Sequence, residues 1–368
     1  MPNSRSHARP EPRSETLVSI TVVCYNSGRF IRRCLEAALS QDGLGVEVIV
    51  IDNASTDGTV DILETFEDRC RIIYNQENVG FAAGQNQAIR LARGQWVLTL
   101  NPDVLLMPGF LASLVAAGES DPSVGTVCGK LLSFKSNFEI PDQPRIDSTG
   151  IFFNPMLRHL DRGSQQIDDG RYSEDEYVFG ATAAAALYRR TMIEDVAVGV
   201  DGQGDFFDPD FFVYREDADV AWRAQLLGWK CIYTPRALGY HVRSVLPGNR
   251  AALNPEINMH SVKNRFLMRI KNMTPGVYRK CFLAATVRDV IVFVACLVKE
   301  QSSLKGLLFV ARNWGKFKQK RAEIMRRRRV DDAYLAQWFA FSPASFPAPK
   351  AARPQLKAAV NALRTANQ

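Results

Sequence analysis

The segment VEVIVIDNASTDGT (46–59) joins an apolar run to a polar turn that leads toward a helix. The run VEVIVIDN (46–53) is mostly apolar, which predicts a strand buried on both faces. Three more strands of this kind are predicted, over 18–26 (VSITVVCYN), 70–75 (CRIIYN) and 95–104 (QWVLTLNPDV). Helical spacing of apolar residues lies between them, over 29–40, 59–66 and 81–93. This alternation predicts an α/β fold whose mostly parallel sheet carries helices on both faces.

Polar residues collect where these predicted strands end. They are Asn26 after the first strand, Asp52 and Asn53 after the second, and Asn101 and Asp103 after the fourth. In open parallel sheets ligands bind outside the carboxyl ends of the strands. The sequence therefore predicts a binding site at this edge.

The acidic residues of these turns allow more than one interpretation. Asp52 can accept hydrogen bonds from a nucleobase or a ribose, whereas Asp57, in Asp-Gly-Thr, fits a turn or a helix cap. In NPDV (101–104), Asp103 can coordinate a divalent cation that bridges a diphosphate. The same three residues also fit an ordinary Asn-Pro-Asp turn, which would be favoured if they stood alone.

Two later segments add candidate groups. YREDADVAWRAQLLGWK (214–230) places Glu216, Asp217 and Asp219 at the front of an amphipathic helix, more carboxylates than helix capping needs. One of them could take the proton from an attacking hydroxyl. In YHVRS (240–244), His241 fits a structural histidine or a metal ligand, with a phosphate-binding guanidinium two residues later.

Bulk properties limit the class of protein. The 368 residues are 46% hydrophobic, which allows a sizeable core, and the seven cysteines show no metal-binding spacing. Cysteines in apolar runs, and an N-terminus without an apolar stretch, predict a cytoplasmic protein with reduced thiols. Between Lys263 and Arg329 there are eighteen basic and three acidic residues, against 28 basic and 36 acidic elsewhere. This asymmetry predicts an anionic partner, such as phospholipid or a phosphorylated acceptor.

Four regions are predicted along the chain. They are a disordered tail (1–15), a catalytic domain (16–255), a basic amphipathic helical region that associates with membranes (256–341) and a flexible tail (342–368). The most apolar stretch is 281–298, but Arg288 and Asp289 interrupt it, and the uninterrupted run 290–298 is too short to span a bilayer. Deleting residues beyond about 275 is expected to solubilise the protein and weaken transfer to a lipid acceptor.

Seven segments follow one another in an order that indicates a protein family more specifically than any one of them alone. They are VSITVVCYN, VIVIDNASTDGT, NVGFAAGQNQAI, LTLNPDV, VFGATAAAALYRR, FFVYREDADVAWRAQLLGWK and YHVRS. The series resembles family 2 glycosyltransferases of the GT-A fold, and among them the bacterial rhamnosyltransferase-like branch. The resemblance covers roughly residues 17–270. It implies an inverting transfer of one sugar in a single displacement.

The resemblance also implies roles for individual residues. Asp217 would be the catalytic base, supported by Glu216. Asp103 and His241 would hold Mg²⁺ or Mn²⁺, with Asn101 in place of the first Asp of the family's motif. The donor would be bound by Tyr25, Asn26, Asp52, Asn78, Gly80, Phe81, Asn86, Asn101 and Arg243. The acceptor would be bound by Gly180, Ala181, Glu216 and Asp219.

The implied donor is a dTDP-, UDP- or GDP-linked sugar, preferably dTDP-rhamnose. The implied acceptor is a hydroxyl of a glycan or of a polyprenyl-diphosphate-linked glycan, in cell-wall or surface-polysaccharide assembly. The enzyme would lie peripherally on the inner face of the cell membrane, bound to its anionic surface through the C-terminal region.

Two other functions compete with this one. A nucleotidyltransferase would need a glycine-rich, lysine-containing loop after the first strand, and CYNSGRF has one glycine and no lysine. An inactive nucleotide-sugar-binding scaffold fits less well, because Asp52, Asp103, Asp217 and His241 are all present. The basic stretch lacks the stacking aromatics of a nucleic-acid site, so no nucleic-acid partner is expected.

Overall fold

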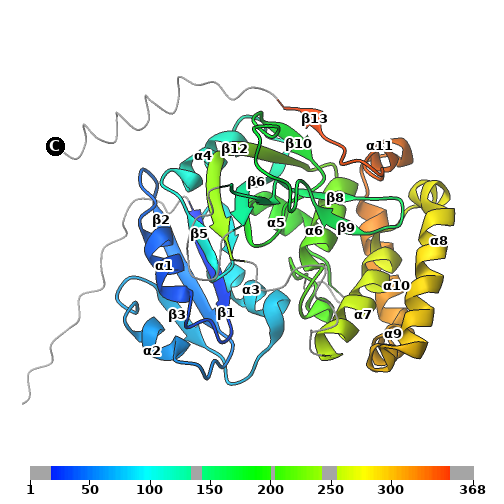
Figure 1. Ribbon diagram of the computed structural model, residues 1–368, viewed down its shortest axis with the longest axis horizontal. Helices are drawn as coiled ribbons and strands as arrows, with labels where there is room; N and C mark the ends of the chain where they lie inside the picture. Colours follow the sequence, from blue (N-terminus) through cyan, green and yellow to red (C-terminus); the bar gives the residue numbers. More distant parts are fainter. Residues whose placement is uncertain (1–17, 134–142, 200–203, 243–254, 349–368) are drawn as a thin grey trace, which may run out of the picture.

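The computed structural model describes residues 18–133, 143–199, 204–242 and 255–348 (Figure 1). Within these residues one large sheet has the strand order β13-β10-β12-β6-β11-β4-β1-β2-β3, with β5 paired to β12 and β7 to β6. Helices pack on both faces of this sheet. The predicted α/β class is confirmed.

The N-terminal part of the chain follows the predicted alternation of strands and helices. It contains β1 (Val18–Cys24), α1 (Ile31–Leu39), β2 (Val46–Asp52), α2 (Thr59–Glu64), β3 (Arg71–Tyr74), α3 (Gly80–Leu91) and β4 (Trp96–Leu100). Strands β3, β2, β1 and β4 are parallel neighbours, with Cys24 beside Asp52 and Val22 beside Leu100. Their carboxyl ends therefore lie at one edge of the sheet.

The rest of the large sheet is mixed. This part of the chain contains β5 (Val104–Leu106), α4 (Phe110–Gly118), β6 (Val124–Ser133), β7 (Ile146–Ser148), β8 (Ile151–Phe153), β9 (His159–Asp161), β10 (Glu176–Val178), β11 (Ala185–Arg189), α5 (Arg190–Val196), η1 (Pro209–Phe211), α6 (Glu216–Leu226) and β12 (Lys230–His241). β11 is antiparallel to both of its neighbours, β4 and β6. β8 and β9 pair antiparallel with each other and form a separate two-stranded sheet.

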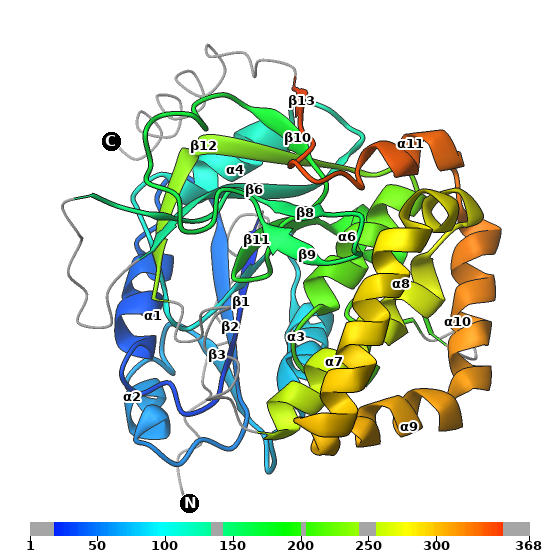
Figure 2. The same ribbon diagram turned by 45° about the vertical axis from the view of Figure 1, so that its right-hand side comes forward.

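A group of helices completes the described chain and packs against α6 (Figure 2). It contains α7 (Pro255–Asn272), α8 (Pro275–Val298), η3 (Gln301–Ser303), α9 (Leu304–Arg312), α10 (Trp314–Arg327) and α11 (Asp332–Gln337), before the short strand β13 (Phe346–Pro347). α8 lies on the outer side of the group in Figure 1.

The C-terminal helices share one apolar core with the predicted catalytic domain. Phe339 is fully buried, and its ring packs against those of Phe153 and Trp222 at 5.4 and 5.0 Å between centroids. Phe317 and Leu335 belong to the same cluster. The predicted boundary at 255 therefore does not separate two cores. A deletion beyond about 275 would remove part of the catalytic core, rather than a membrane appendage alone.

Much of the basic surplus is used inside the protein. Lys271 contacts Asp208 at 2.5 Å and Asp219 at 3.0 Å, and Lys320 contacts Asp208 at 2.7 Å. All four side chains are buried. Burial alone would raise the pKa of Asp208, but the charges of Lys271 and Lys320 hold that pKa below its ordinary value. These lysines thus bind acidic residues of the same chain.

The arginine run 326–329 ends the basic stretch for which the sequence predicts an anionic partner, and it also forms ion pairs within the chain. Arg326 and Arg327 contact Glu323, Arg328 contacts Asp332, and Arg329 contacts Asp195 on α5. Several of these side chains are exposed, so each pair stabilises the fold only weakly. The run therefore ties the end of α10 to the catalytic domain.

The buried cluster yields a prediction for stability. Replacing Lys320 with methionine preserves side-chain length but leaves Asp208 with one cationic partner. The free energy of unfolding in urea should fall by about 3 kcal/mol, because removing one partner from a buried ion-pair network is costly. Lys318→Met changes an exposed lysine of the same helix and should stay within about 0.5 kcal/mol of the unaltered protein. Equal stabilities for the two variants would contradict this role.

Candidate active site

The first part of the site lies at the ends of β1 and β2. Asp52 is buried, and its carboxylate accepts hydrogen bonds from the backbone N–H of Ser55 at 3.0 Å and from its hydroxyl at 2.5 Å. Asn26 adopts a left-handed φ of 50° and accepts a bond from the Thr56 N–H. Tyr25, beside it, is 52% exposed. An exposed aromatic ring thus stands next to a fixed polar turn.

Asp57 behaves as a turn residue. Its carboxylate accepts hydrogen bonds from the backbone N–H groups of Gly28 and Thr59 and from the Thr59 hydroxyl. These bonds fasten the loop after β1 to the start of α2. The turn interpretation of Asp57 therefore agrees with the structure, whereas the N-cap of α2 is Gly58.

The predicted donor-binding residues at α3 turn largely toward the protein. Asn78 accepts a hydrogen bond from the Gly80 N–H, and the Phe81 ring meets that of Phe207 edge-on. Asn86 is buried, and its amide both donates to and accepts from the Phe207 backbone, at 2.6 and 3.0 Å. These bonds occupy the Asn86 amide, so the structure differs from the predicted donor contact and makes Asn86 a support for the segment before α6.

The predicted metal ligands meet at the next strand ends. β5 pairs antiparallel with β12, with Val104 opposite His241. This register brings Asp103 Oδ1 to 3.4 Å from His241 Nε2. The other ring nitrogen, Nδ1, lies 2.8 Å from Asp147 Oδ2 on β7. Burial lowers the pKa of His241, but the charges of Asp147 and Asp103 outweigh it and raise that pKa to about 10.

These residues fit a divalent cation. A metal-binding histidine usually donates its second ring N–H to a carboxylate, which fixes the ring, and Asp147 is placed to accept that bond. His241 Nε2 and Asp103 Oδ1 face each other and could share one ion. The described residues hold no cluster of three or more Asp, Glu, His or Cys side chains suited to a metal. Substrate oxygens and water would therefore complete the shell, as is usual for Mg²⁺. Asn101 lies at the end of β4, two residues before Asp103.

The acidic pair at the start of α6 approaches the same edge from the other side. Asp217 Oδ2 accepts a hydrogen bond from the Ala183 N–H at 3.3 Å. The next residue, Ala184, accepts a bond from the Asn101 N–H at 2.8 Å. One short backbone segment thus lies between Asp217 and the end of β4. Four groups far apart in the sequence (Asp52, Asp103, Asp217 and His241) converge on this rim.

Glu216 and Asp217 differ in environment. Glu216 is buried, and within the described chain its Oε2 has no hydrogen-bond partner. Burial, and then the charge of Asp217, raise the pKa of Glu216 well above its ordinary value. The neutral acid form of Glu216 is therefore favoured beside Asp217. Paired carboxyl groups with different environments are typical of sites that divide acid and base roles.

Asp219, predicted to touch the acceptor, lies elsewhere. It is fully buried, and its oxygens accept bonds from Arg223, Lys271 and Asn272. Gly180 packs against α6 so closely that an added Cβ would lie 2.2 Å from Ala221 Cβ. Ala181 is likewise buried. The structure therefore differs from the predicted acceptor contacts, because these three residues support α6 from inside the protein.

One predicted site residue is untested, and sequence reasoning missed several residues that support the site. Arg243, the predicted phosphate contact, lies outside the described residues. Asp147 was missed because it stands in a polar, irregular stretch with no motif. The buried polar residues of α7 were missed too. Lys263 and Lys271 lie eight residues apart, as do Asn264 and Asn272, and this spacing is close to two helical turns.

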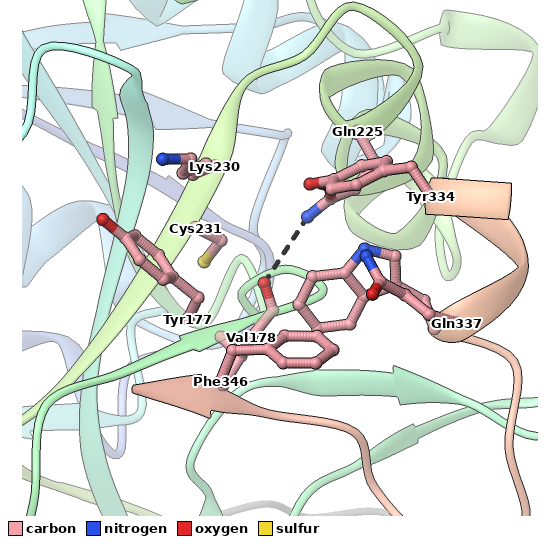
Figure 3. A pocket seen from close by; sticks show the side chains of 9 residues that line it. Tyr177, Val178, Gln225, Lys230, Cys231, Tyr334, Gln337 and Phe346 are labelled. Carbon is pink, nitrogen blue, oxygen red and sulfur yellow. Dashed lines mark hydrogen bonds between the residues drawn. The ribbon is translucent and has the colours of Figure 1, made fainter. Parts of the chain in front are cut away.

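A pocket of about 220 Å³ lies away from this rim (Figure 3). Tyr177, Lys230 and Tyr334 are among the residues that line it, together with Gln225 from the last turn of α6. Gln225 is eight residues from Asp217, or about 12 Å along the helix axis. Lys230 begins β12, whereas His241 ends it. The pocket is therefore separate from the candidate active site.

The N-terminal half of the chain has the sequence of a known enzyme family. Residues 19–197 match the family model for glycosyl transferase family 2. These residues form a family 2 glycosyl transferase domain. The match confirms the predicted likeness to family 2 glycosyltransferases, and the sheet topology agrees with the predicted α/β class. The matched residues of this glycosyl transferase domain contain Asp52 and Asp103, while Asp217 and His241 lie beyond them.

Several relatives of the glycosyl transferase domain are known. The chain is 29% identical to the succinoglycan biosynthesis protein ExoO of Rhizobium meliloti, over 46% of this chain and 56% of ExoO. The chain thus spans about half the length of that relative. It is 24% identical to the N-acetylglucosaminyl-diphospho-decaprenol L-rhamnosyltransferase of Mycobacterium tuberculosis, over 64% of this chain and 79% of that protein. The solved mannosyltransferase PcManGT of Pyrobaculum calidifontis, in complex with GDP-Man and Mn²⁺, aligns over 91% of both chains with 19% identity and a TM-score of 0.48.

Proposed function

We propose that this protein is an inverting glycosyltransferase that moves one sugar from a nucleoside-diphosphate donor to an acceptor hydroxyl. The observation that carries the proposal is the pairing of Asp103 with His241, 3.4 Å apart, at the strand ends of a family 2 domain. Asp217 approaches the same rim through Ala183. A binding scaffold would need no carboxylate at that position.

The donor half of the site would hold the nucleotide. Asp52 and Asn26 would flank the nucleobase or ribose, and the exposed ring of Tyr25 would cover it. Asp103 and His241 would hold Mg²⁺ or Mn²⁺ against the diphosphate. When bound, the ion would neutralise the negative charge that develops on the leaving diphosphate. The chain's own contribution is to fix the two ligands through the β5–β12 pairing and the Asp147 contact.

The acceptor half would deprotonate the nucleophile. Asp217 would accept the proton of the acceptor hydroxyl as its oxygen bonds to the anomeric carbon and the diphosphate leaves on the opposite face. This displacement inverts the configuration at that carbon. Glu216, whose neutral form is favoured, would keep negative charge low beside the base.

The relatives favour a cell-surface glycan as the product. The rhamnosyltransferase of Mycobacterium tuberculosis is matched over most of its length, which supports dTDP-rhamnose as the preferred donor and a polyprenyl-diphosphate-linked glycan as the acceptor. UDP- and GDP-linked sugars remain the donors to compare with it. ExoO, a succinoglycan biosynthesis protein, supports the same general role in polysaccharide assembly.

The base assignment gives the main test of this function. Asp217→Asn keeps the side-chain shape and removes the proton acceptor, so transfer should fall at least 10²-fold while the affinity for the donor changes less than threefold. Transfer would be followed with a panel of nucleotide sugars, and donor binding by calorimetry. Asp68→Asn, at an exposed carboxylate, is the control and should leave both unchanged. Full activity in Asp217→Asn would remove the base assignment.

We also propose that the protein lies on the inner face of the cell membrane through α8. The sequence predicts a run too short to span a bilayer, but among the described residues α8 is the one helix whose length and composition would suffice to cross a membrane, and 17% of its most apolar stretch is buried. Asp289, in its middle, pairs with Arg265 and Arg269 of α7. This charged contact holds α8 along the protein and favours a peripheral position. Exposed apolar side chains line the other side of α8, among them Leu283, Val287, Val290, Ile291 and Val294.

A triple substitution tests this position. Val287, Val290 and Val294 form one exposed stripe at helical spacing, so changing all three to Gln should leave the fold intact. Partition onto anionic lipid vesicles, measured by co-sedimentation, should fall at least tenfold, because buried apolar area drives interfacial binding. Ile167→Gln, at an exposed apolar residue outside α8, should bind the vesicles as the unaltered protein does. Unchanged partition of the triple variant would contradict the proposal.

A further inference from the structure

The loop that delivers the acidic pair is held in a conformation that its residues disfavour. Phe212, Tyr214 and Arg215 have φ values of 65°, 65° and 71°, in the left-handed region that favours glycine. Arg215 is the N-cap of α6, so this loop sets the positions of Glu216 and Asp217. Such backbone persists only where surrounding contacts enforce it, and it is common at functional sites.

One buried side chain supplies much of that enforcement. Asn264 of α7 is fully buried, and its Nδ2 lies 2.9, 2.8 and 2.8 Å from the carbonyl oxygens of Phe211, Val213 and Tyr214. Its two N–H groups donate to these three oxygens, so one N–H is shared between two of them. Three carbonyl oxygens around one amide fix its orientation, because a flipped amide would turn its own oxygen toward them. The bonds reach the loop on both sides of Phe212.

Neighbouring contacts hold the same loop. The His260 ring of α7 stacks on that of Phe212, with centroids 4.8 Å apart. Lys263 donates to the Asp210 carbonyl. On the opposite side, the Phe212 carbonyl accepts a bond from the Ala82 N–H, and Gly80 lies so close that an added Cβ would be 2.5 Å from the Phe212 ring. The loop is therefore clamped between α3 and α7.

We propose that Asn264 is a positioning residue for the acidic pair, acting through the backbone of residues 211–215. Without its amide the left-handed loop would relax and move α6 relative to the rim. A shift of about 1 Å in a reacting group can cost about 10²-fold in rate. The amide of Asn264 is engaged with this loop and not with the nucleotide-binding edge around Asp52, so donor affinity should be preserved. The inference rests on the proposed function for its catalytic readout, but its structural readout does not.

Asn264→Leu tests the proposal, because leucine matches the shape of asparagine and cannot donate. The control is Leu267→Ala, which removes buried methyl groups from the same helix and no bond to the loop. Both variants are compared at a temperature at which circular dichroism shows them folded. Two quantities are measured: kcat with the donor KM, and hydrogen exchange of the backbone amides of 211–217.

In Asn264→Leu, exchange over 211–217 should quicken at least tenfold relative to Leu267→Ala, and kcat should fall at least tenfold with the donor KM within threefold. Asn264→His keeps a ring N–H donor and should recover part of the lost kcat. Unchanged exchange in folded Asn264→Leu would overturn the proposal, whatever the rate. If the unaltered protein transfers no sugar from any donor, the proposed function fails, while the exchange result still decides whether Asn264 clamps the loop.

Discussion

The pairing of β5 with β12 is the contact on which the candidate active site depends. β5 comes directly after the fourth parallel strand, whereas β12 is formed much later in the chain. Their register sets Asp103 against His241, and β7, on the other side of β6, supplies Asp147 behind the imidazole. Backbone hydrogen bonds thus fix a pair of side chains that no local motif could hold.

α6 must meet that pair from the opposite side, and the C-terminal helices keep it there. Lys271 enters between Asp208 and Asp219, and Asn272 donates to Asp219, so the first turns of α6 are tied to α7 by buried charge. A buried ion pair contributes little net stability over an apolar contact, but losing one partner is costly. Such a network specifies the position of α6 more than it stabilises the fold. These contacts also pair lysines of the basic C-terminal region with acidic residues of the mildly acidic region before it.

The sequence predicted the parallel half of the sheet well, because continuous apolar runs such as 46–53 and the polar residues after them are local signals. It did not predict the direction of β11, since apolar periodicity carries no information on strand polarity. Asn86 and Asp219 fit binding motifs, yet the Phe207 backbone and Lys271 occupy them. Those partners are distant in sequence, so no spacing could reveal them. For the same reason the arginine run 326–329 resembled a membrane-binding surface, although it forms pairs with Glu323, Asp332 and Asp195.

The central claim is that Asp103 and His241 together bind a cation that holds the donor's diphosphate. Calorimetric titration of UDP, GDP and dTDP in Mn²⁺, with the unaltered protein and Asp103→Ala, tests it most directly. We expect the nucleotide that binds best to lose at least tenfold in affinity on substitution, and the two proteins to bind it equally in EDTA. Equal affinity in Mn²⁺ would contradict the claim, because the carboxylate would then contribute nothing to the diphosphate site.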